Sequence, residues 1–191
     1  MIRIMVCGVI AASLVGCTAT PPAGQTPSTT SQTTTGAASG PGQRNIDWAG
    51  RICEVAAKEL PVFRAEPRVD WTTTDTARSD LVAYLDGLAK AARRMVDGWT
   101  AAGSPELPDG DLIAMNIVGN MDVAADLLEQ ARDEIAAAKG QAALEAALAD
   151  VEEDLSRIGN LDPGAFVADH PLAVEAFNTA RPCRDLAKAR S

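Results

Sequence analysis

Few residues in this chain of 191 have the type and spacing needed for catalysis or for metal binding. His170 is the only histidine, so a Ser-His-Asp triad or a multi-histidine metal site would have to include it. Pro171 follows at the expected start of a helix, and Asp169 stands where a helix dipole favours negative charge. We therefore expect His170 at a capping or surface position, with a role as a ligand or in proton transfer as the alternative.

Motifs for other chemistries are absent from the sequence. It contains no Glu-x-x-His pair for a di-iron bundle, no Cys-x-x-Cys-His for covalent haem, and no Gly-x-Ser-x-Gly or Ser-x-x-Lys nucleophile. Acidic residues cluster in the run Asp150–Asp154, but consecutive residues spread around a helix, so this run predicts a solvated face, with weak divalent-cation binding as the alternative. We predict no catalytic residue, no metal site and no cofactor.

The first sixteen residues have the layout of a secretory leader. One positive charge at Arg3 precedes an uncharged, mostly apolar stretch from Ile4 to Leu14, and small residues follow. This stretch is too short to cross a bilayer. We expect residues 1–16 to be a signal peptide that is removed on export.

The four residues Leu14-Val15-Gly16-Cys17 resemble the lipobox of bacterial lipoproteins. In that family the cysteine is lipidated and becomes the first residue after cleavage. The resemblance covers only the leader, and it implies a palmitate-type anchor on Cys17 and attachment to the exported face of the cell membrane. Arginine outnumbers lysine 13 to 4 and alanine is abundant, a usage typical of high-GC genomes, so we expect an actinobacterial source.

Two further cysteines, Cys53 and Cys183, remain after Cys7 is removed with the leader and Cys17 is acylated. Export places them in an oxidising compartment, where two such cysteines in one domain usually form a disulfide. A bridge closing about 130 residues would stabilise the fold by roughly 5 kcal/mol in the chain-entropy model. We predict this disulfide, with two separate buried thiols as the alternative.

The segment after Cys17 has a tether-like composition. Residues 18–43 contain only Thr, Pro, Ala, Gly, Gln and Ser, which cannot bury enough surface to offset the entropy of ordering. We expect residues 17–44 to form a disordered tether, either plain or glycosylated. The net charge of −9 argues against nucleic acid and against direct binding to anionic lipid, so the lipid on Cys17 is the expected membrane contact.

Residues 45–191 show helical spacing of apolar residues and no alternation typical of strands. The pattern predicts an all-α fold, an antiparallel bundle of four main helices plus a short C-terminal helix, clasped by the Cys53–Cys183 disulfide. Methionines 95, 115 and 121 fall at core spacing and are expected to fill the core rather than bind haem. The four stripes run from Ala49 to Leu60, ending before Pro61, from Leu81 to Trp99, from Ile113 to Ala138, and from Leu144 to Ile158.

Polar residues interrupt the third stripe at Asn116, Asn120 and Asp122, together with Gly119. Amides and a glycine within a long helix lower its propensity. They are candidate binding residues that would serve a partner, a buried water or a close helix contact, although we expect simple packing and solvent exposure.

Two aromatic residues, Phe63 and Trp71, lie in the proline-rich connection between the first two helices. Aromatics on irregular backbone are common at recognition surfaces. We expect this connection to cover the core, with a recognition surface at Phe63 and Trp71 as the alternative.

The predicted membrane anchor and the absence of motifs for catalysis or metal binding together favour one function. We expect a lipid-anchored cell-envelope protein that acts as a non-enzymatic interaction or accessory module on a flexible stalk, with an envelope protein as a possible partner. The alternative is a binder of a cation, haem or lipid. Alanine-rich stripes disfavour a large apolar ligand because they let helices pack closely.

Overall fold

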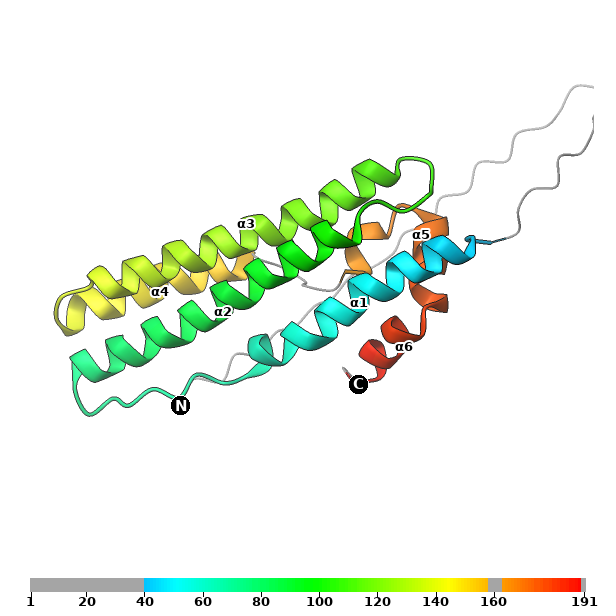
Figure 1. Cartoon of the computed structure of the whole chain (residues 1–191). Coiled ribbons are helices and arrows are strands. Elements are labelled where there is room, and N and C mark those ends of the chain that lie inside the picture. Colours follow the sequence, from blue (N-terminus) through cyan, green and yellow to red (C-terminus); the bar gives the residue numbers. More distant parts are fainter. Residues whose placement is uncertain (1–39, 158–162, 190–191) are drawn as a thin grey trace, which may run out of the picture. The chain divides into compact units, whose positions relative to one another are not determined.

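The structure is a computed structural model that describes residues 40–157 and 163–189. These residues belong to a compact unit, Ala38–Ser191, and within the described ranges they form helices without strands (Figure 1). The predicted all-α class is therefore confirmed. The leader and Cys17 lie outside the described residues. The elements are α1 (Gln43–Arg64), α2 (Thr74–Ala102), α3 (Gly110–Ala137), α4 (Gln141–Arg157), the 3-10 turn η1 (Ala165–Val167), α5 (Pro171–Thr179) and α6 (Arg181–Lys188).

Helices α2 and α3 form the long antiparallel hairpin at the centre of the domain. The Thr73 side chain accepts a hydrogen bond from the Thr76 N–H at 3.1 Å and so caps α2, as expected near Thr74. Gly103 ends α2 with a φ of 69°, a backbone conformation that glycine adopts at little cost. Both predicted stripes are buried in the hairpin, from Leu81 to Trp99 and from Ile113 to Ala138.

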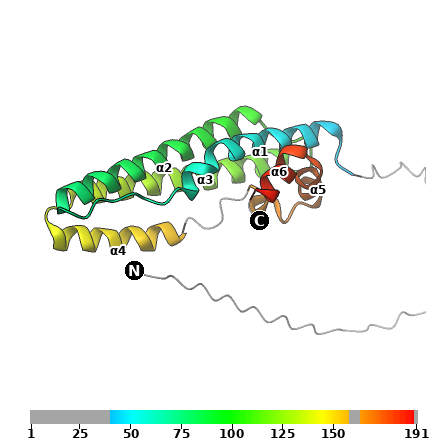
Figure 2. The ribbon, with the colours of Figure 1, turned by 90° about the horizontal axis from the view of Figure 1, so that it is seen from below.

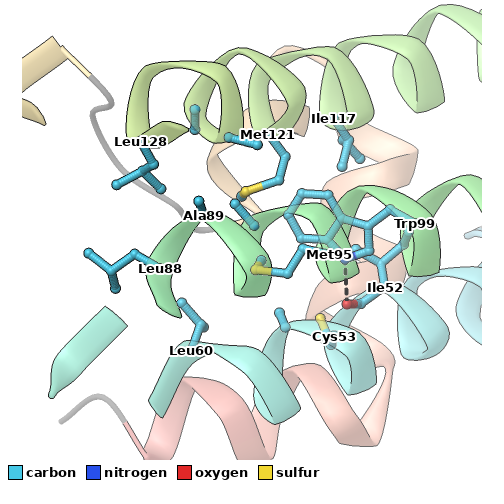
Figure 3. Packing of buried hydrophobic residues seen from close by; sticks show 14 of the residues in the cluster. Ile52, Cys53, Leu60, Leu88, Ala89, Met95, Trp99, Ile117, Met121 and Leu128 are labelled. Atoms are coloured by element: carbon cyan, nitrogen blue, oxygen red, sulfur yellow. Dashed lines mark hydrogen bonds between the residues drawn. The ribbon is translucent and has the colours of Figure 1, made fainter. Parts of the chain in front are cut away.

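Different helices cover the two halves of this hairpin. Figures 1 and 2 show α4 beside one half, whereas α1, α5 and α6 gather at the other. Two indole N–H groups fix α1 against the end of α2: Trp48 donates to the Gly103 carbonyl at 2.8 Å, and Trp99 donates to the Ile52 carbonyl at 3.0 Å. Figure 3 shows the second bond within the core. Helices α1 and α4 therefore each pack along part of the α2–α3 hairpin rather than along its full length.

The prediction that the first helix ends at Pro61 is wrong, because α1 continues to Arg64. Its beginning also differs, since Gln43 and Arg44 belong to α1 rather than to the tether. Pro61 is exposed and lies in the last turn, where the lost backbone donor removes only one helical hydrogen bond.

The C-terminal segment folds back on α1 and is joined to it by a disulfide. Cys53 of α1 and Cys183 of α6 form this bond with their Cα atoms 5.0 Å apart, which confirms the predicted pair. Phe177 of α5 packs edge-to-face on Trp48, with ring centroids 5.6 Å apart. Two short helices form where one was predicted, because Pro182 lies in the first turn of α6, a position that suits proline.

Candidate functional site

The exposed face of α3 carries large apolar side chains in its first half. Leu112, Met115 and Val123 are 45%, 63% and 60% exposed, so the prediction that Met115 fills the core is wrong. With Asn116 and Gly119 they form what we call the outer strip of α3. These residues recur at helical spacing on the side of α3 opposite the buried stripe of Ile113, Ile117 and Met121. The strip therefore presents three large apolar side chains, with Asn116 and Gly119 between them, that no described element covers.

The amides predicted as candidate binding residues lie on or beside this strip. Asn116 and Asn120 are exposed, and the Asn120 side-chain amide donates to the Asn116 carbonyl at 2.7 Å. Gly119 is also exposed, and a Cβ added there would meet no atom within 4 Å. Gly119 therefore makes no close contact with another described helix, and a close approach at this point is open to another molecule.

Asp122, the third candidate, is part of an ion-pair cluster between α2 and α3. Arg93 of α2 binds Asp122, Asp126 and Glu129, with its Nε 2.8 Å from a Glu129 oxygen. The hydrogen bond from Arg93 lowers the pKa of Glu129, and in turn the bonds from Glu129 and Asp126 raise the pKa of Arg93. Asp122 thus helps to join the hairpin, and its carboxylate also borders the outer strip.

The two aromatic candidates have different environments. Phe63 lies in the last turn of α1 and packs, half-buried, against the core. Trp71 lies in the connection to α2 and is 64% exposed. Phe63 therefore covers the core from α1, the connection leaves Trp71 exposed, and of these two residues only Trp71 remains available for recognition.

The residues considered for catalysis occupy dispersed positions. His170 is the N-cap residue of α5, but its side chain makes no capping hydrogen bond. It lines a cavity of about 190 Å³ with Asp109 and Asp169. Asp150, Glu152 and Glu153 are exposed on α4, as expected for a solvated face. Among the described residues, no group of three or more His, Cys, Asp or Glu side chains is arranged to hold a metal ion.

No protein-family model matches the chain. Neither the curated proteins nor the solved structures contain a significant match to it. Within the described ranges, no helix has the length and apolar character needed to span a membrane. The outer strip of α3 and the exposed Trp71 therefore stand as the candidate sites on geometry alone.

Proposed function

We propose that this protein is a lipid-anchored component of the cell envelope whose helical domain binds a protein partner without catalysing a reaction. The observation that carries the proposal is the outer strip of α3, since three large apolar side chains lie exposed on the face of the helix opposite its buried stripe. Large apolar side chains that gather on one exposed face are a feature of interaction sites.

The partner that fits the outer strip best is an amphipathic helix. The strip is one helix face wide, and Gly119 leaves space for another backbone to approach. Exposed carboxylates at Asp111 and Asp126 flank the strip on one side. A helix with apolar residues at its centre and basic residues along one edge would complement both features.

The anchor is proposed on the sequence alone, from the lipobox-like residues ending in Cys17. Replacing Cys17 with Ser removes the thiol that would be acylated, so we expect the protein to leave the membrane fraction or to retain its leader. Fractionation of producing cells and intact mass measure the two outcomes. Normal processing together with unchanged membrane retention would contradict the anchor.

The docking face is tested by placing charge on the outer strip of α3. Lysine is a good helix former, and a lysine at position 115 can pair with Asp111 four residues earlier, so we expect Met115→Lys/Val123→Lys to keep the fold but abolish partner binding. The measurement is the native mass of the full-length protein extracted from membranes in mild detergent. We expect a complex for the wild type and the free chain for the double variant.

A matched control is Ala142→Lys/Ala149→Lys, which places two lysines on exposed positions of α4. This control should migrate with the wild type. A complex that survives in the Met115→Lys/Val123→Lys variant would exclude the outer strip, and a complex made only of copies of this chain would exclude a separate partner. The alternative function, binding of a cation, haem or lipid, stays a prediction that no contact among the described residues favours.

A further inference from the structure

The three tryptophans of the chain have contrasting environments. Trp48 and Trp99 are 1% exposed, and each donates its indole N–H to a backbone carbonyl. Trp71 has neither property, since most of its surface is exposed and its indole N–H donates to no described residue. The core does not explain why this position carries the largest apolar side chain.

The loop that presents Trp71 is held by hydrogen bonds on both sides of the residue. The Asp70 N–H donates to Asp80 of α2 at 2.8 Å, and the Thr72 N–H donates to the Asp70 carboxylate at 2.9 Å. Thr73 then caps α2. The backbone around Trp71 is therefore fixed, and the ring is presented from a preorganised position.

A cleft of about 260 Å³ lies beside Trp71, between the start of α2 and the start of α4. This volume is below the roughly 300–1,000 Å³ of pockets for drug-sized ligands, so the cleft suits a small group such as one ring of a longer molecule. Because α2 and α3 are antiparallel, the start of α2, where the cleft lies, is at the opposite end of the hairpin from the start of α3, where the outer strip begins (Figure 1). Its lining residues are Trp71, Thr72, Thr73, Thr74, Gln141, Leu144 and Glu145.

The chemistry of this lining defines the ligand. Glu145 carries the only charge among the described lining residues, so a phosphate or carboxylate would meet no cation. Threonine hydroxyls and the Gln141 amide both donate and accept hydrogen bonds, which matches hydroxyl groups better than it matches a cation. Gln141 donates to Glu145 at 2.9 Å, and this bond orients both side chains at the edge of the cleft.

An aromatic ring adds a second requirement. The negative face of the indole attracts weakly positive C–H bonds, and one face of a sugar ring is lined with such bonds. A quaternary ammonium group is usually enclosed by several aromatic rings, whereas this cleft has one. We propose that the cleft beside Trp71 binds one ring of a neutral glycan, with the ring stacked on Trp71 and its hydroxyls bonded to Gln141, Glu145, Thr72 and Thr74. This site is independent of the proposed protein partner.

The test uses the full-length protein in a detergent without a sugar headgroup, titrated with chitotriose in its N-acetylated form and with maltotriose. Ligand-observed NMR and calorimetry measure binding, and quenching of tryptophan fluorescence reports protection of Trp71. We expect saturable binding of at least one trisaccharide and protection of the exposed tryptophan. The corresponding monosaccharide should bind more weakly if the natural ligand is a polymer and equally well if it is a free sugar.

Two variants of Trp71 and one control separate a loss of stacking from a loss of folding. Trp71→Ala should weaken binding by about tenfold or more because it removes the stacking surface, whereas Trp71→Tyr should retain most of it. Leu172→Ala, which changes an exposed apolar side chain elsewhere, should bind as the wild type does. Equal unfolding midpoints would show that all three variants are folded. Binding of choline but of neither trisaccharide, no saturable binding at all, or full binding by Trp71→Ala would overturn the proposal.

Discussion

Reduction of the Cys53–Cys183 disulfide should lower the free energy of unfolding by roughly 5 kcal/mol at most, the largest single effect that we expect in this domain. The two cysteines are 130 residues apart in sequence, so the bond closes most of the domain into one loop and restricts the unfolded chain. It also holds α6 on α1, where the cysteine side chains are buried. Denaturant unfolding of the same sample with and without a reductant measures the effect.

Cys53→Ala/Cys183→Ala provides a second form of this experiment. The double variant lacks the bond under both conditions, so its stability should match that of the reduced wild type and should not respond to the reductant. A loss below about 1 kcal/mol in both samples would mean that packing, rather than the bond, holds α5 and α6 on α1.

Gly110→Ala should destabilise the domain by about 3 kcal/mol, the second-largest effect. A Cβ at this buried first residue of α3 would lie 2.1 Å from the Pro105 carbonyl oxygen. Atoms this close repel each other, so the backbone would have to move. The loop before α3 has little freedom to move, because the Asn45 side chain donates to the Glu106 carbonyl at 3.2 Å. Thermal and denaturant unfolding measure the loss.

Gly87→Ala is the matched control for this prediction. Gly87 lies within α2, and an added Cβ would meet no atom within 4 Å. The substitution should therefore be neutral or stabilise by up to about 1 kcal/mol through helix propensity. If the two variants are equally stable, the close approach at Gly110 does not constrain the fold.

Periodicity predicted the helices of the hairpin because both of their apolar stripes face the core. The stripe from Leu81 to Trp99 is buried throughout, and α2 ends three residues beyond it at Ala102. The spacing of apolar residues was less informative at prolines, because a proline can either end a helix or lie in one of its terminal turns. Pro61 was expected to stop α1 but lies inside its last turn, and Pro182 begins a further helix. Which helix covers which half of the hairpin depends on packing between distant residues, which spacing alone does not specify.

The candidate sites were only partly accessible from the sequence. The amides Asn116 and Asn120, which the sequence singled out, lie on or beside the outer strip of α3, but the exposure of the apolar side chains near them was not predicted. The core spacing predicted for Met115 is wrong, because it lies six residues before the buried Met121 and on another face of the helix. Its position relative to Ile113 and Ile117 already placed it on the polar face, together with Leu112 and Val123. The cleft beside Trp71 could not be predicted, since it joins residues about 70 positions apart.

Site-specific photo-crosslinking in the cells that produce the protein shows whether the outer strip of α3 contacts a partner protein. A photoreactive amino acid is placed at position 115 or 123, or at position 142 or 149 of α4 as controls. We expect positions 115 and 123 to crosslink to the same protein, through a helical segment of it, and the α4 positions not to crosslink to it. Crosslinks from all four positions alike, or none from 115 and 123, would contradict it.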